Sequence, residues 1–127
     1  MAAYRIRLID HTGSPKEVTA AIQAELKGFF DRVFANTSDQ ATVVWGAGAS
    51  SDAVVLHFVE DVASSFIVKN MKRPPKIGAG VGGHTTVRGK EICSEFYRTV
   101  TRGGKTRTLS ARDYAKLAFH EALHNVH

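Results

Sequence analysis

The chain has 127 residues, of which 43% are hydrophobic and 23% are charged, and its formal net charge is +5 at pH 7. This composition is typical of one folded domain, and no apolar run approaches the roughly 20 residues that a transmembrane helix needs. The single cysteine, Cys93, excludes an internal disulfide, and arginines near the N-terminus interrupt any apolar stretch of a cleavable signal peptide. We therefore expect one domain over residues 1–127, cytoplasmic or exported without a cleavable signal peptide.

The excess of positive charge lies mainly in two segments, residues 69–76 (KNMKRPPK) and residues 98–112. A basic surface attracts nucleic acid through the release of counterions. Neither segment, however, interleaves its charges with the aromatic side chains on which bases would stack. The sequence therefore favours solvated loops over a nucleic-acid partner.

The first two predicted elements are a strand and a helix. Residues 4–10 (YRIRLID) alternate apolar and polar side chains, as a half-buried strand does. Ser14 and Glu17 then have the spacing of a capping box around Pro15, a residue that suits the first helical position. The helix is expected to run to about Ala35, because apolar residues recur behind the cap at helical spacing: Val18, Ile22, Leu26 and Val33.

Four predicted strands follow, at residues 42–45, 53–60, 77–87 and 91–101. The segment 53–60 (AVVLHFVE) is apolar on both faces, which predicts an interior strand. The segment 77–87 (IGAGVGGHTTV) is a strand loosened by glycines. In the last strand, Glu91 and Glu95 share one face, which we expect to be solvated.

A tight turn at residues 102–105 (RGGK) leads into a second helix over residues 109–127. Ser110 is the expected cap, and Asp113 is favourable in the first turn. The resulting order predicts an α+β fold, a twisted mixed sheet of about five strands packed against two long helices.

The second helix carries the pattern HEALH, residues 120–124. Residues four apart lie on one helix face, so His120 and His124 can direct ring nitrogens at one metal ion. Glu121 lies about 100° further around the helix, where its carboxylate reaches a metal-activated water rather than the metal. The spacing therefore supplies two zinc ligands and a general base.

With this motif, the chain resembles the N-terminal subdomain of zincin metallopeptidases, and HEALHN is similar to the HExxHN of many metzincins. The resemblance implies Zn²⁺ at His120 and His124, and Glu121 as the general base. It also implies a peptide or protein substrate bound antiparallel to an edge strand by main-chain hydrogen bonds. Residues 78–86 are the candidate strand, in which Gly80, Gly82 and Gly83 would allow the close approach of a peptide backbone.

The sequence departs from the metzincin pattern HExxHxxGxxH after the second histidine. His127 stands at the glycine position, and the position of the third histidine lies beyond the end of the sequence. The third ligand remains open between His127, His84 and a residue beyond the chain end. His57, inside an apolar strand, is expected to be a hydrogen-bonded core residue. The simplest expectation is a truncated chain that lacks a small C-terminal subdomain.

The leading hypothesis is thus a zinc-dependent metallopeptidase. One alternative is a metal-dependent endoribonuclease, because a family of ribosomal RNA processing proteins also carries histidines at helical spacing. Those proteins have HGxxHxxGxDH, so Glu121 favours the peptidase. A second alternative is a non-catalytic binding domain with an incomplete metal site.

Overall fold

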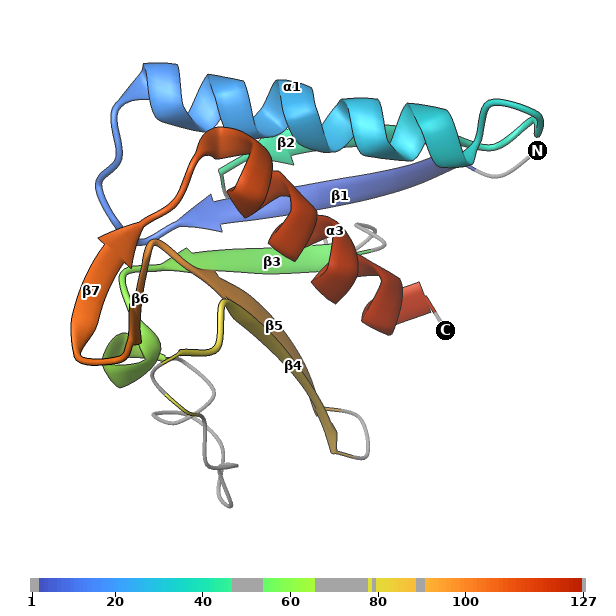
Figure 1. Ribbon diagram of the computed structural model, residues 1–127. Coiled ribbons are helices and arrows are strands. Elements are labelled where there is room, and N and C mark those ends of the chain that lie inside the picture. The colour runs from blue at the N-terminus through green and yellow to red at the C-terminus, as the bar shows by residue number, and fades with distance from the viewer. Residues whose placement is uncertain (1–2, 47–53, 66–77, 79, 89–90, 127) are drawn as a thin grey trace.

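The computed structural model describes residues 3–46, 54–65, 78, 80–88 and 91–126, and it confirms the α+β class (Figure 1). The elements in chain order are β1 (Ala3–Asp10), α1 (Lys16–Val33), β2 (Gln40–Trp45), β3 (Val54–Val59), the 3₁₀ turn η1 (Val62–Ser64), β4 (Gly83–Arg88), β5 (Glu91–Tyr97), β6 (Thr99–Arg102), β7 (Lys105–Thr108) and α3 (Ala111–Val126). Within these residues, no helix has both the length and the apolar character needed to cross a membrane.

Five strands form a mixed sheet in the order β2-β1-β3-β5-β4. β1 pairs in parallel with β2 and β3, and β3 pairs in parallel with β5. β4 is an edge strand and pairs antiparallel to β5. The strand predicted over residues 53–60 is interior, as expected, since β3 lies between β1 and β5. The glycine-rich segment therefore supplies an edge of the sheet.

Both helices cover the same face of the sheet (Figure 1). The side chains that β1 and β3 turn toward the helices alternate with those of the opposite face, as the strand period of two requires. Together with the helices they form one apolar core, whose members include Ile6, Leu8, Ile22, Leu26, Leu56, Phe58, Phe96, Tyr114, Ala118 and Ala122. This core fixes the position of α3 across β3, β5 and β4.

The capping box predicted for the first helix is wrong. The helix begins at Lys16 with Pro15 as its N-cap, and no side chain caps it. Ser14 instead belongs to the preceding turn, where the Asp10 carboxylate accepts hydrogen bonds from the N–H groups of Thr12 and Ser14, at 2.9 and 3.1 Å. The turn thus uses Ser14, which the sequence assigned to the cap, whereas Glu17 lies in the first turn of the helix. At the second helix the prediction holds, because the N–H of Asp113 donates to Ser110 Oγ at 3.1 Å.

Two predicted strands have different limits in the structure. β4 begins only at Gly83, so Gly80 and Gly82 precede it. The strand predicted over residues 91–101 divides at Arg98 into β5, which pairs with β3 and β4, and β6, which pairs with β7. β6 and β7 then form a separate hairpin.

The hairpin turn was predicted correctly. Gly103 and Gly104 both have positive φ, 58° and 75°, a conformation that glycine adopts without a steric penalty. Such a pair of residues gives the two-residue turn whose twist matches that of the flanking strands. The ribbon of β6 and β7 projects beside the N-terminal half of α3 (Figure 1).

Candidate metal centre

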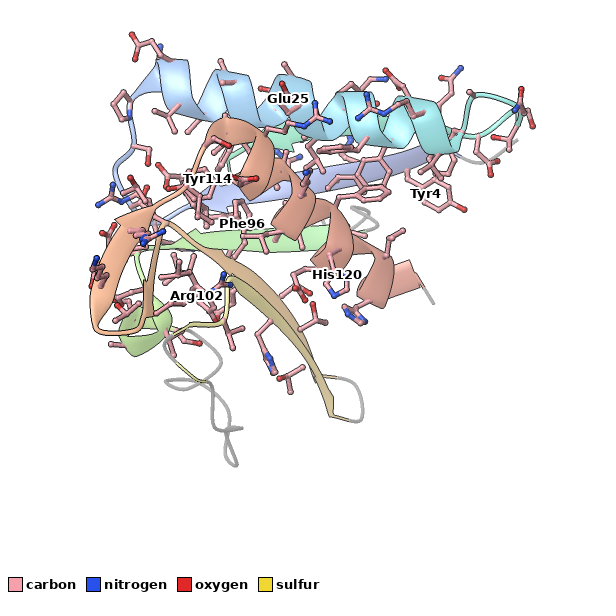
Figure 2. All side chains as sticks on the ribbon, in the orientation of Figure 1. Tyr4, Glu25, Phe96, Arg102, Tyr114 and His120 are labelled. Carbon is pink, nitrogen blue, oxygen red and sulfur yellow. The ribbon has the colours of Figure 1, made fainter. Side chains whose placement is uncertain are left out.

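The imidazoles of His120 and His124 approach each other on the exposed side of α3 (Figure 2 labels His120). Their Nε2 atoms are 3.1 Å apart, and the ring planes are perpendicular. Two nitrogens that each bind a tetrahedral zinc at about 2.0–2.1 Å are separated by about 3.3 Å. The pair therefore already has nearly the separation of two ligands of one ion.

The Glu121 side chain is buried, with 4% of its surface exposed, and lies between α3 and the edge strand β4. The Thr85 hydroxyl donates to Glu121 Oε1 at 2.8 Å. Thr85 Oγ1 also lies 2.9 Å from the hydroxyl oxygen of Ser94, a residue that is 1% exposed. The Thr85 hydroxyl thus holds the carboxyl group of the predicted general base, one residue along the helix from His120, and Ser94 lies within hydrogen-bond distance of that hydroxyl.

Two of the glycines predicted to contact substrate also allow α3 to approach the sheet closely. A Cβ on Gly83 would lie 2.8 Å from Glu121 Oε2, and one on Gly82 would lie 2.9 Å from both methyl carbons of Leu117. The third, Gly80, accepts a hydrogen bond at its carbonyl from Arg102 Nε, at 3.0 Å. Of the three, only Gly83 belongs to β4.

The upstream histidines lie away from His120 and His124. Phe96 faces the helices in the core, so its neighbour Glu95 faces the other side of the sheet. His57 on β3 and His84 on β4 both stand opposite Glu95 in the strand register and share that far face. The structure therefore does not bring His84 to the predicted centre.

Each of the two upstream histidines has another neighbour. His84 Nε2 lies 2.9 Å from Thr86 Oγ1, and His57 Nδ1 lies 2.9 Å from His11 Nε2. His57 is thus hydrogen-bonded, as predicted, but it is half-buried on the far face of the sheet rather than part of the core. Among the described residues, no three His, Cys, Asp or Glu side chains gather as a metal site. His127 lies outside those residues.

The far face contains a buried polar cluster that the sequence did not predict. Glu95, expected on a solvated face, is fully buried, and its Oε1 accepts hydrogen bonds from the hydroxyls of Ser65 and Tyr97. Burial and, next, the nearby Glu95 carboxylate raise the pKa of the Tyr97 hydroxyl. Burial and, next, the proximity of His11 lower the pKa of His57, although Glu95 opposes this shift.

Thr85 and Ser94 are the site residues that sequence reasoning missed. Strand alternation places Thr85 on the same face as Gly83, so the signal was present in residues 83–88. That Glu121 is the helix residue in contact with this face of β4 depends on how α3 packs on the sheet, and no local sequence pattern specifies that packing.

The chain matches no protein-family model, and comparison with the curated proteins and with the solved structures finds no match.

Proposed function

We propose that this protein is a zinc-dependent metallopeptidase. The observation that carries the proposal is the 3.1 Å separation of the His120 and His124 Nε2 atoms, with Glu121 as the next residue after His120. Two nitrogen donors at this separation suit zinc better than a hard cation such as Mg²⁺, which prefers oxygen ligands. These two donors therefore suit two of the three protein ligands that a catalytic zinc takes.

Each residue of the motif has a separate role in this proposal. His120 and His124 hold the ion, which when bound supplies a Lewis acid and makes water a better nucleophile at neutral pH. Glu121 accepts a proton from the attacking water at its carboxylate and delivers it to the departing amine. Thr85 is a positioning residue, because its hydroxyl fixes one carboxyl oxygen of Glu121.

The substrate class proposed here is an extended peptide. β4 is the edge of the sheet and lies along α3 through Gly83 and Thr85. An edge strand presents unpaired backbone groups, and an extended peptide can pair with them antiparallel. A peptide on β4 would pass beside the helix turn that carries Glu121.

The test is hydrolysis of an unstructured polypeptide by zinc-loaded protein, with Glu121→Gln and Glu121→Asp alongside. Glu121→Gln is expected to lower the rate at least about 100-fold while the zinc content stays unchanged, because general-base catalysis contributes about 10²- to 10⁴-fold. Equal rates for Glu121→Gln and the native chain would contradict the proposal. Cleavage of RNA but not of polypeptide would favour the endoribonuclease, and zinc without either activity would favour a binding domain.

A further inference from the structure

A groove of about 330 Å³ lies between the β6–β7 hairpin, the start of β4 and the N-terminal half of α3. Its apolar lining includes Gly82, Val100 and Leu117, and three charged residues also line it: Arg102, Lys116 and Asp113. Figure 2 shows Arg102 beside the start of β4. The groove therefore combines an apolar floor with charged walls.

Positive charge predominates around this groove. In the hairpin register Val100 stands opposite Arg107, and Arg102 stands opposite Lys105. Residues opposite each other in an antiparallel pair share a face, so Lys105 and Arg107 are on the same face of the ribbon as Val100. Neither β6 nor β7 contains an acidic residue. Arg102 and Lys116 therefore line the groove, Lys105 and Arg107 add positive charge on the same face of the hairpin, and Asp113 is the one acid among the described residues that line it.

The hairpin that carries these cations is tied to the rest of the fold. Arg102 Nε donates to the Gly80 carbonyl, and the Tyr114 hydroxyl donates to the Arg98 carbonyl at 2.7 Å. The same hydroxyl accepts from the Leu109 N–H at 3.0 Å, which joins both ends of the hairpin to α3. The guanidinium of Arg98 also makes two hydrogen bonds to Glu60, at 2.6 and 2.7 Å. The hairpin backbone and the Arg102 guanidinium are thus held in place by contacts within the chain.

The groove lies next to the candidate metal centre along α3 and the start of β4. Leu117 lines the groove and packs against Gly82, and Glu121 follows one helical turn later and packs against Gly83. His120 is only three residues beyond Leu117, about 4.5 Å along the helix axis. A peptide lying on β4 would therefore enter the groove as it leaves the centre.

We infer that this groove binds acidic side chains of the substrate, on the C-terminal side of the bond that is cleaved. The inference rests on the proposed function, in which a peptide lies antiparallel to β4. β4 runs from Gly83 to Arg88, so an antiparallel peptide leaves the strand at Gly83 with its C-terminal part. Glutamate suits the site, because its methylene groups pack on the apolar floor while its carboxylate faces Arg102 and Lys116.

The experiment measures binding of fluorescein-labelled octapeptides to Glu121→Gln protein by fluorescence anisotropy at low salt. The peptides place three Glu, three Gln or three Lys in an otherwise alanine sequence. Replacing Arg102 and Lys116 by Gln should weaken binding of the Glu peptide about threefold to tenfold, as expected for the loss of two exposed charge pairs. Asp113→Asn should strengthen it. The control, Lys27→Gln with Arg32→Gln on α1, removes the same charge and should change binding less than twofold.

The inference is overturned if the Glu and Gln peptides bind equally, or if the α1 control weakens binding as much as the groove variant does. Tighter binding of a single-stranded oligonucleotide, lost in the same groove variant, would also overturn it, in favour of nucleic acid. The two proposals fail separately. Binding of the acidic peptide without zinc binding would refute the peptidase and leave only the groove's preference for acidic side chains, whereas hydrolysis that does not depend on nearby acidic residues would refute the groove alone.

Discussion

The hydroxyl of Thr85 on the edge strand β4 donates a 2.8 Å hydrogen bond to Glu121 Oε1 on α3. This contact joins the strand proposed to bind the peptide to the carboxyl group proposed to move the proton. Gly83, two residues earlier on the same face, leaves the space that the other carboxyl oxygen occupies. The position of Glu121 is therefore set by the sheet as much as by its own helix.

Replacing Thr85 by Val should lower kcat about tenfold and leave KM and the zinc affinity unchanged. The reason is that valine keeps the volume of threonine but removes the donor to Glu121, and a hydrogen bond to a carboxylate contributes about 1.5–3 kcal/mol. Thr85→Ser, which keeps the hydroxyl, should restore most of kcat. Steady-state kinetics measure kcat and KM, and a zinc titration measures the zinc affinity. An equal loss of kcat in Thr85→Val and Thr85→Ser would refute the positioning role.

Replacing Gly83 by Ala should lower the free energy of unfolding by about 1–3 kcal/mol, because the new methyl group overlaps Glu121 Oε2 and approaches the Glu95 carbonyl oxygen to 3.1 Å. Gly28→Ala is the matched control. Apart from the backbone of its own helix, no described atom lies within 4 Å of a Cβ there, and helix propensity favours alanine by about 0.8–1 kcal/mol. Urea unfolding of both variants measures the difference, and similar effects of the two substitutions would contradict the packing described here.

Replacing Tyr114 by Phe should destabilise the fold by about 1–3 kcal/mol, since the change removes the partner of the Leu109 N–H and of the Arg98 carbonyl. It should also loosen the hairpin, which amide hydrogen exchange at residues 99–108 would detect. Tyr4→Phe serves as the control, because Tyr4 packs against Phe34 through its ring, which phenylalanine retains. An equal loss of stability in the two variants would argue against the role of the Tyr114 hydroxyl.

The lowered pKa of His57 predicts that stability falls as the solution becomes acidic. Below the ordinary value of 6.5 the unfolded chain binds a proton that the folded chain resists, so the free energy of unfolding decreases with falling pH until the folded pKa is reached. One such group contributes at most about 1.4 kcal/mol per pH unit. His57→Gln should reduce the difference between urea unfolding at pH 7.5 and at pH 5.5. An unchanged difference would show that His57 does not control it.

Local patterns predicted much of the architecture. Alternation identified β1, apolar character on both faces placed β3 inside the sheet, and the pair of glycines after Arg102 gave the hairpin turn. These signals succeed because neighbouring residues alone decide them. The capping box failed because the Asp10 carboxylate competes for the backbone of the same turn, a contact that sequence spacing does not reveal.

The candidate site was predictable only in part. Helical periodicity places His120 and His124 on one face, and the structure brings their nitrogens together. The contact between Thr85 and Glu121 spans 36 residues, and that between Ser65 and Glu95 spans 30. Such pairs depend on the order of strands in the sheet, so no local pattern specifies them.

Zinc stoichiometry is the most direct test of the central claim, that His120 and His124 bind a catalytic zinc. Elemental analysis of the purified, zinc-equilibrated chain should find one zinc per chain. The same value is expected for Glu121→Gln, and none for His120→Ala or His124→Ala. Absence of zinc above background from the native chain, or its retention in His120→Ala, would refute a zinc site at His120 and His124.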